Sequence, residues 1–217
     1  MNVANLNKLG INLEELKQNC DKLFNKKSVN EISSWDYEEL DPFFKNIVQI
    51  FKNHFNLKEK ITLRKLRIER NTNKSYNSEK LPYIPHIDFN RCLKFMIYFN
   101  DIDQNNGCIH ISHVNPNLYE EKRLKLKPNK DSNKTYNNHI TDLKKESYLP
   151  MTGKAGDIIF FDTNQPHYGG NFLSKSDQRF ILRIDFVNKD WKYPFLKKKV
   201  SWRKYSVSFK DEIRFYR

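Results

Sequence analysis

The first quarter of the chain places hydrophobic residues at the three- and four-residue spacing of amphipathic helices. Residues 13–24 show this spacing behind Asn12, a potential cap, and Glu15, at the reciprocal capping position. A second helix is predicted to begin at Asp41-Pro42, an N-cap followed by proline at the first helical position. We expect residues 1–60 to form a helical buttress against a sheet. The apolar stripe of the second helix comprises Phe44, Ile47, Val48, Phe51 and Phe55.

From residue 61 onward the pattern changes to the two-residue alternation of β-strands. In the second predicted strand, Lys94, Met96 and Tyr98 face one way and the apolar residues between them face the other. Asn106-Gly107 predicts a hairpin turn after this strand. Short strands that follow two helices predict an α+β protein, mainly β, with an antiparallel sandwich or barrel. The predicted strands are 61–70, 93–99, 108–112, 157–162 and 179–186.

The length of 217 residues suits a single domain, which we divide into regions by composition. Residues 61–187 are expected to form the β core. Within it, residues 114–150 are polar and rich in Lys and Asn, and this segment is too long for an ordinary connection. We interpret it as an insertion near a site and as a candidate lid. Residues 188–217 form a basic, aromatic C-terminal extension.

The chain carries a formal net charge of +13, which favours anionic partners. Part of this excess is local, because residues 188–217 contain ten basic and three acidic side chains. A positive surface of this kind suits nucleic acid, a membrane surface or an anionic small molecule. Solvated surface lysines without a partner are the alternative explanation.

Other features of composition bear on the compartment. The sequence has no apolar run near the ~20 residues that span a bilayer. The first 30 residues lack the apolar stretch of a secretory signal, so we expect a cytoplasmic protein. Cys20, Cys92 and Cys108 show no C-x-x-C spacing, which predicts buried free thiols rather than disulfides or a zinc site.

One short motif has the spacing of a metal site. In His86-Ile87-Asp88 the imidazole and the carboxylate are two residues apart, so on a strand they share a face and can bind one ion. His167 follows a predicted strand in a turn from which its side chain can reach the same ion. Two histidines and one carboxylate are the ligand set of a non-haem Fe(II) site. The other histidines are His54 on a helix, His110 and His113 at a strand, and His139 in the insertion.

Two stretches of the sequence resemble the phytanoyl-CoA dioxygenase-like (PhyH) branch of the Fe(II)/2-oxoglutarate oxygenases. They are PHIDFNRCLKFMIYFNDIDQNNGCIHISHVNP and GKAGDIIFFDTNQPHYGGNFLSKSDQRFILRIDF, and the resemblance covers residues 82–187. The matching features, in chain order, are His86 and Asp88, Phe99-Asn100-Asp101, Gly107, Ser112-His113, Gly156-Asp157, His167 and Arg179.

The resemblance implies a double-stranded β-helix (jelly-roll, cupin-like) core with Fe(II) at its open end. It implies that 2-oxoglutarate chelates the iron and that its distal C5 carboxylate pairs with Arg179, whose guanidinium fork suits a carboxylate. Arg183, on the same strand face, competes for that contact. Lys94 or Tyr98 is a further candidate for contact with the co-substrate. O2 is the remaining reactant at the iron.

The implied reaction is hydroxylation of an unactivated C–H bond, coupled to decarboxylation of 2-oxoglutarate. Related halogenases have Ala or Gly at the position of Asp88, which leaves room for chloride, so the carboxylate favours hydroxylation. The positive charge and the basic insertion favour a small, anionic metabolite as the substrate. The sequence does not identify that substrate.

Other functions remain open at this point. A nucleic-acid-acting oxygenase would use the C-terminal aromatics, which alternate with basic residues. A prolyl-hydroxylase-like enzyme acting on a protein typically has Lys where this chain has Arg179. A catalytically inert jelly-roll binding module is disfavoured by the complete ligand set. The aromatics in question are Trp191, Tyr193, Phe195, Trp202, Tyr205, Phe209, Phe215 and Tyr216.

Overall fold

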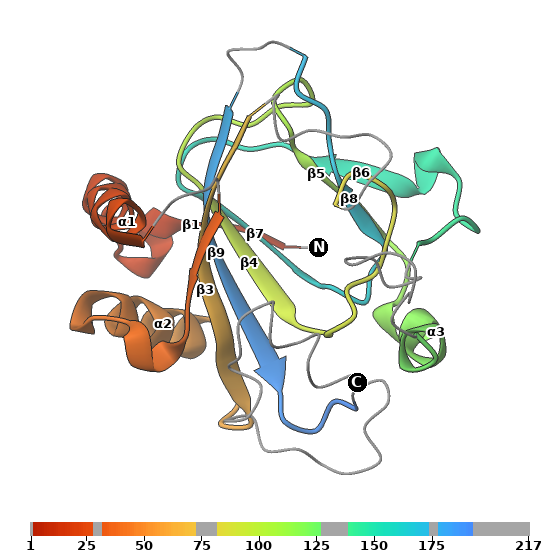
Figure 1. Cartoon of the computed structure of the whole chain (residues 1–217), viewed down its shortest axis with the longest axis horizontal. Helices are drawn as coiled ribbons and strands as arrows, with labels where there is room; N and C mark the ends of the chain where they lie inside the picture. Colours follow the sequence, from red (N-terminus) through yellow and green to blue (C-terminus); the bar gives the residue numbers. More distant parts are fainter. Residues whose placement is uncertain (1, 28–31, 73–81, 127–138, 174–177, 193–217) are drawn as a thin grey trace.

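A computed structural model describes residues 2–27, 32–72, 82–126, 139–173 and 178–192. Within these residues the chain folds into two antiparallel sheets that face each other, and α1 and α2 cover the outside of the larger one (Figure 1). The helices are α1 (Leu13–Lys27), α2 (Pro42–His54) and α3 (Glu120–Leu124). The strands are β1 (Asn2–Asn5), β2 (Ile32–Trp35), β3 (Ile61–Thr72), β4 (Leu93–Tyr98), β5 (Ile109–Ser112), β6 (Tyr148–Met151), β7 (Asp157–Asp162), β8 (His167–Gly169) and β9 (Gln178–Asn188).

The strand order is that of a double-stranded β-helix. In the described residues the larger sheet runs β1-β7-β4-β9-β3-β2 and the smaller sheet runs β6-β5-β8. After β4 the chain passes to the smaller sheet for β5 and β6, returns for β7, crosses again for β8 and returns for β9. This alternation wraps the two sheets around a shared interior. The predicted α+β, mainly β jelly roll is therefore confirmed.

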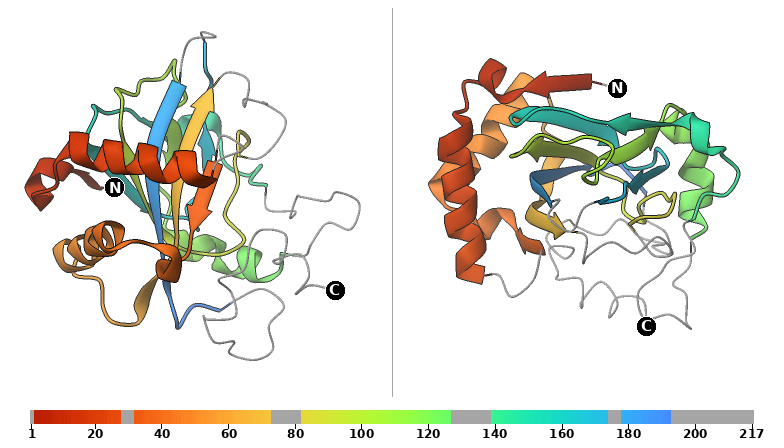
Figure 2. Two further views of the ribbon diagram at one scale, coloured as in Figure 1. Left: turned by 60° about the vertical axis from the view of Figure 1, so that its left-hand side comes forward. Right: turned by 90° about the horizontal axis from the view of Figure 1, so that it is seen from above.

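The two N-terminal helices form where their caps predict. The side chain of Asn12 accepts a hydrogen bond from the Glu15 backbone N–H at 2.9 Å, and Asp41 accepts one from Phe44 at 3.1 Å. Both helices lie together on one side of the molecule, whereas α3 lies on the other (Figure 2). Four apolar residues of α2 pack against the outer face of the larger sheet, namely Phe44, Ile47, Val48 and Phe51.

The side-chain alternation of β4 separates an outer core from an interior. Phe95 and Ile97 belong to the apolar cluster under the helices, while Met96 and Tyr98 belong to the cluster between the two sheets. Lys94 shares the inward face by its position on the strand. The predicted alternation of this strand is confirmed, and it aims polar residues of β4 into the space between the sheets.

Residues 1–60 were predicted to be helical, but they also contain two short strands, β1 and β2. β1 pairs with β7, and β2 pairs with β3, so the N-terminal region also extends both edges of the larger sheet. Each strand has only four residues. Runs of that length carry too few alternating positions to be distinguished from a loop.

The predicted hairpin at Asn106-Gly107 is wrong, because β4 and β5 lie in different sheets. The segment between them crosses from one sheet to the other. Gly107 is nevertheless required there, since its φ is +87° and a Cβ would lie 2.4 Å from the ring of Phe172. The local turn signal was real, but it could not specify which strands the turn connects.

The segment predicted as a polar insertion contributes ordered structure at both ends. Its first part forms a 3-10 turn, Pro116–Tyr119, and α3, and its last part forms β6 of the smaller sheet. Residues 127–138, the centre of the candidate lid, lie outside the described residues. So do residues 193–217, which include all but one of the C-terminal aromatics.

The remaining expectations on composition concern cysteines and membrane spans. Cys20, Cys92 and Cys108 are buried free thiols, as predicted. In the described part of the chain, every helix is too short or too polar to cross a lipid bilayer.

Candidate metal centre

The fold brings the three predicted metal ligands together. His86, Asp88 and His167 each offer one ligand atom, and these atoms lie within 4.8 Å of one another. The two histidines are buried, at 4% and 2% exposure, and Asp88 is half-buried. The cluster lies at one end of the space between the sheets, where the segment before β4 runs beside β8.

Backbone pairing fixes the relative positions of the three ligands. The N–H of His86 donates to the carbonyl of His167 at 3.0 Å, and the reverse bond measures 2.9 Å. The N–H of Asp88 donates to the carbonyl of Thr163 at 3.1 Å. Ile87 is fully buried on the opposite side of the segment. The two-residue spacing of the motif thus aims the imidazole and the carboxylate to one side, as predicted.

The orientation of both imidazole rings leaves one nitrogen available to a metal. Nδ1 of His86 lies 2.7 Å from the carbonyl oxygen of Ile84, and Nδ1 of His167 lies 2.8 Å from that of Gln165. A carbonyl only accepts, so each Nδ1 carries the proton and each Nε2 keeps its lone pair. Nε2 of His167 is buried and has no hydrogen-bond partner in the described part of the chain. A buried lone pair of this kind fits a metal ion.

Local electrostatics favour the charge states that bind a metal. Burial lowers the pKa of both His86 and His167, so both rings are neutral at neutral pH. Burial alone would raise the pKa of Asp88, but the Lys94 ammonium beside it holds this pKa well below its usual range. Two neutral imidazoles and one carboxylate are the donors that Fe(II) prefers in an open three-ligand site.

Lys94 and Tyr98, the two candidates on β4, have partners within the protein. Nζ of Lys94 donates to Oδ2 of Asp88 at 2.9 Å. The hydroxyl of Tyr98 donates to the carbonyl of Met151 at 2.7 Å, and the residue is fully buried. Lys94 therefore contacts a candidate metal ligand directly, whereas Tyr98 connects the larger sheet to β6.

Arg179 and Arg183 both face inward from β9, but their partners differ. Arg183 donates to two carboxylates, those of Asp185 and Glu69. Arg179 is 5% exposed, and it donates to the carbonyl of Gly107 at 2.6 Å and to the amide oxygen of Asn71 at 3.0 Å. Its Nε is buried and has no hydrogen-bond partner among the residues that the structure describes. Within the described residues, Arg183 forms ion pairs with two carboxylates, whereas Arg179 forms none.

Sequence reasoning missed several residues that surround the ligands. The guanidinium of Arg91 donates to both carboxylate oxygens of Asp162. Its Nε lies 3.1 Å from Oδ1 and 2.9 Å from Oδ2, and its Nη2 lies 2.6 Å from Oδ2. The ring of Phe161 contacts that of His167 at 4.9 Å between centroids. His139, which we placed in the polar insertion, pairs with His86 in a backbone bridge. No sequence pattern signalled these contacts, since residues 158–161 are all apolar and do not show which face of β7 is inward.

Arg123, which sequence reasoning also missed, links the segment that follows Asp88 to two other parts of the chain. Its guanidinium is fully buried and donates to the carbonyl of Phe89 at 3.3 Å and to that of Lys192 at 2.6 Å. Glu120, three residues earlier, supplies the matching charge at 2.6 Å. The helix α3 is thereby attached next to Asp88. A charged residue in a polar segment gives no sequence signal for such a contact.

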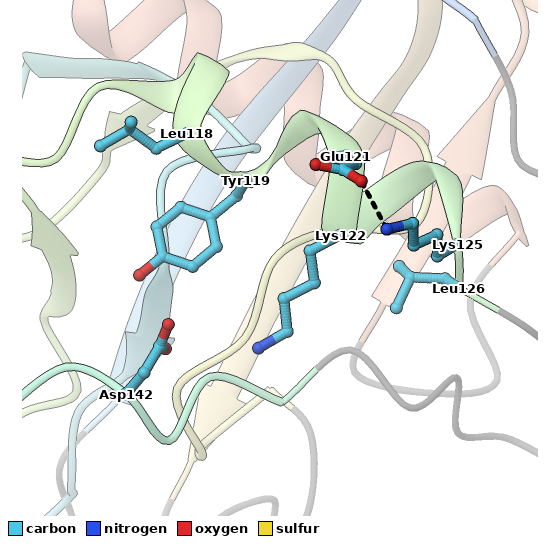
Figure 3. Close-up of a pocket in the computed structure, with 7 residues that line it drawn as sticks. All are labelled: Leu118, Tyr119, Glu121, Lys122, Lys125, Leu126 and Asp142. Atoms are coloured by element: carbon cyan, nitrogen blue, oxygen red, sulfur yellow. Dashed lines mark hydrogen bonds and ion pairs between the residues drawn. The ribbon is translucent and has the colours of Figure 1, made fainter.

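A pocket of about 580 Å³ lies beside α3 (Figure 3). Its walls include Tyr119 and Leu126, which pack with Ile87 in a small apolar cluster. The hydroxyl of Tyr119 points toward the carboxylate of Asp142 (Figure 3). The pocket is therefore behind the ligand segment, and no metal ligand is among its described lining. The lining residues are Leu118, Tyr119, Glu121, Lys122, Lys125, Leu126 and Asp142.

Solved structures share this fold at low sequence identity. The epimerase SnoN, in complex with Fe3+, alpha ketoglutarate and nogalamycin RO, aligns at 15% identity with a TM-score of 0.56, over 84% of this chain and 76% of its own. The carbocyclase SnoK from nogalamycin biosynthesis aligns at 13% identity with a TM-score of 0.54, over 84% of this chain and 77% of its own. HygX from Streptomyces hygroscopicus with iron bound aligns at 11% identity with a TM-score of 0.55, over 88% of this chain and 82% of its own. These likenesses establish the fold.

The jelly roll and its ligand cluster together define a non-haem iron oxygenase. The profile of the Phytanoyl-CoA dioxygenase (PhyH) family matches residues 14–180, and the chain belongs to that family of Fe(II)- and 2-oxoglutarate-dependent oxygenases. The resemblance first drawn from the two motif stretches is thus confirmed. No curated protein sequence matches the chain.

Proposed function

We propose that the chain hydroxylates an unactivated C–H bond of a small, anionic metabolite, with His86, Asp88 and His167 as the iron ligands. The observation that carries this proposal is the convergence of three donor atoms within 4.8 Å, one of them a buried imidazole nitrogen without a partner. Iron and 2-oxoglutarate, when bound, supply the activation of O2. The protein supplies the binding geometry and the exclusion of water.

Each ligand has a defined part in that geometry. The two imidazoles hold the ion through Nε2, because their Nδ1 protons are directed to the carbonyls of Ile84 and Gln165. Asp88 offers the Oδ1 atom, which is 3.7 Å from each Nε2. Three ligands on one side of the ion leave the other side open for the co-substrate and O2.

Arg179 is the residue that we propose for the C5 carboxylate of 2-oxoglutarate. Its guanidinium is buried, its described partners are two neutral oxygens, and its Nε is unpartnered. A buried cation without a counter-ion gains more from an incoming carboxylate than one that is already paired. Arg183 is already paired with Asp185 and Glu69, so an anion there would have to compete with two acids.

Arg179→Ala is expected to raise the 2-oxoglutarate concentration needed for half-maximal turnover by at least about 30-fold. This corresponds to about 2 kcal/mol, the lower end of the cost of removing one partner of a buried charged pair. The measurement is the initial rate of succinate formation against 2-oxoglutarate, with the melting temperature recorded to detect misfolding. Arg183→Lys is the matched control, because it keeps a cation between Asp185 and Glu69. A larger effect from Arg183→Lys would transfer the assignment to Arg183.

The preference for an anionic substrate is supported by the interior as well as by net charge. Arg67 lies directly opposite Arg183 in the β3–β9 register, and both face the space between the sheets. Only Asp185, at 3.9 Å, forms an ion pair with Arg67 among the described residues. Because Arg183 is neutralised by Asp185 and Glu69, Arg67 is the guanidinium of the two that favours an anion in this space.

The nucleic-acid alternative gains no support from the part of the extension that is described. Trp191 packs against the guanidinium of Arg91, with 4.8 Å from the cation to the ring centroid. That face of its ring is therefore occupied by a protein contact. The other aromatics of the alternative lie outside the described residues.

The proposed function is tested by anaerobic titration of the apo-protein with Fe(II) and 2-oxoglutarate. We expect a weak visible charge-transfer band that requires both additions, followed by succinate release when the correct anionic substrate is supplied. A wild-type protein that binds neither partner would refute the assignment of the site. If the protein shows the band but releases succinate only with nucleic acid, then its substrate is nucleic acid rather than a small anionic metabolite.

A further inference from the structure

The two carboxylate oxygens of Asp88 have different partners. Oδ1 lies 3.7 Å from Nε2 of His86 and 3.7 Å from Nε2 of His167. Oδ2 accepts a hydrogen bond of 2.9 Å from the ammonium of Lys94. An ion held between the two imidazoles therefore meets Oδ1, while Oδ2 is already bound to a cation.

The ammonium of Lys94 is confined by its surroundings. Its side chain is 6% exposed, and the residue sits on the inward face of β4 directly opposite Asp185 of β9. Nζ also lies 5.6 Å from the centre of the Phe161 ring, which itself contacts the ring of His167. A buried lysine between an aromatic ring and two carboxylates has little freedom to leave Asp88.

We propose that Lys94 is a positioning residue that restricts Asp88 to coordination through one oxygen. A carboxylate that used both oxygens would occupy two positions on the ion. One of these positions is needed if a chelating co-substrate and O2 are both to bind opposite three protein ligands. This inference rests on the proposed function, and it assigns Lys94 to Asp88 rather than to 2-oxoglutarate itself.

The charge of Lys94 gives the proposal a distinctive sign. A buried ammonium repels a metal ion nearby, so Coulomb's law alone predicts that removing it strengthens metal binding. Removing the restraint on Oδ2 instead frees that oxygen to bind the ion. Both effects favour the metal, and the second one obstructs the co-substrate. A lysine with a purely structural role would lower fold stability and both affinities together.

The test compares Lys94→Met with the wild-type protein in two binding measurements. Apo-protein is titrated with Mn²⁺, and free Mn²⁺ is followed by electron paramagnetic resonance. 2-Oxoglutarate is then titrated calorimetrically into the Mn²⁺-loaded protein. We expect the variant to bind Mn²⁺ at least as tightly as the wild type. We expect its affinity for 2-oxoglutarate to fall by at least about tenfold, or about 1.4 kcal/mol, because the freed Oδ2 competes with the co-substrate for a coordination position.

Lys65→Met is the matched control. Lys65 is also a buried inward-facing lysine opposite Asp185, but its ammonium pairs with Asp36 at 2.8 Å and touches no metal ligand. Its loss is expected to lower the melting temperature and to leave both affinities unchanged. Equal loss of 2-oxoglutarate affinity in the two lysine variants would overturn the proposal.

Other outcomes also decide the matter. Wild-type affinity for 2-oxoglutarate in Lys94→Met, or a parallel loss of Mn²⁺ binding, would overturn the role of Lys94 and leave the proposed function standing. Failure of the wild-type protein to bind Mn²⁺ or 2-oxoglutarate would overturn the proposed function and this inference with it. If Lys94→Met does not fold, a crystal structure of the Mn²⁺-loaded wild type decides. Both oxygens of Asp88 on the ion would refute the restraint, and Oδ1 alone with Lys94 on Oδ2 would support it.

Discussion

His167→Ala is expected to abolish iron-dependent turnover while the protein remains folded. The imidazole Nε2 is buried and has no hydrogen-bond partner among the described residues, so its removal takes away a candidate metal donor without breaking a described hydrogen bond at that atom. Partners of metal ligands are worth about 10–100-fold in activity, and a ligand itself should exceed the upper end of that range. The visible band of the Fe(II)–2-oxoglutarate complex should be absent in the variant.

The fold of this variant is the necessary control. Loss of the ring contact with Phe161 and of the Nδ1 bond to Gln165 should cost about 1–3 kcal/mol of unfolding free energy. His110→Ala is the matched variant. His110 lies in β5, next to β8, and its ring stacks on that of Tyr168 in β8, but it is not a proposed ligand. It should lose stability in the same way and keep the iron. Turnover by a folded His167→Ala protein would exclude the proposed ligand set.

Asp185→Asn is expected to produce the largest loss of stability. Asp185 is fully buried and accepts three hydrogen bonds from Arg183, at 3.0, 3.3 and 2.8 Å, and Arg67 lies 3.9 Å away. Asparagine keeps the volume but removes the charge, which leaves cations uncompensated in the interior. Breaking a buried pair in this way costs about 3–5 kcal/mol. Urea denaturation of the apo-protein measures this loss.

The pH dependence provides a second check on Asp185. Burial alone would raise the pKa of this carboxyl, but Arg183 and then Arg67 lower it overall. Its contribution to stability is therefore full above the pKa of an unfolded aspartate, about 3.9, and is lost as the pH falls through the lower folded value. The difference between wild type and Asp185→Asn should be constant near neutral pH and should shrink in acid. A difference that grows in acid would contradict this account.

An exposed pair supplies the control for this prediction. Asp190 pairs with Lys60 at the surface, where both side chains are about half exposed or more. Asp190→Asn should change the unfolding free energy by less than about 1 kcal/mol, because solvent screens such pairs. A comparable loss in the two variants would indicate a general effect of charge rather than a buried pair.

The candidate metal cluster was predictable from the sequence because the spacing of its residues carries geometric information. A separation of two residues fixes His86 and Asp88 on one face, and the family pattern then identifies His167. The alternation in β4 likewise placed Lys94 on the same face as Met96 and Tyr98, and the structure shows that this face is the interior. The pattern could not name its partner, because the contact with Asp88 depends on how the preceding segment folds back across the sheet.

Signals that act only locally were less informative. Asn106-Gly107 correctly marked a turn but did not show that the chain crosses to the other sheet there. β1 and β2 are too short for an alternation to be recognised, and their pairing is decided by neighbours distant in sequence. The choice between Arg179 and Arg183 likewise depends on which of the two inward guanidiniums meets acids from β3 and β9.

The contacts of Arg123 have a consequence for which positions tolerate change. Its guanidinium grips the main-chain carbonyls of Phe89 and Lys192, and a carbonyl is present whatever side chain a residue carries. Substitutions at positions 89 and 192 therefore leave this clamp intact, whereas the arginine has no substitute with the same fork of donors. In a mutational scan, Arg123 should be intolerant of every replacement, while Lys192, which is exposed, should accept most of them.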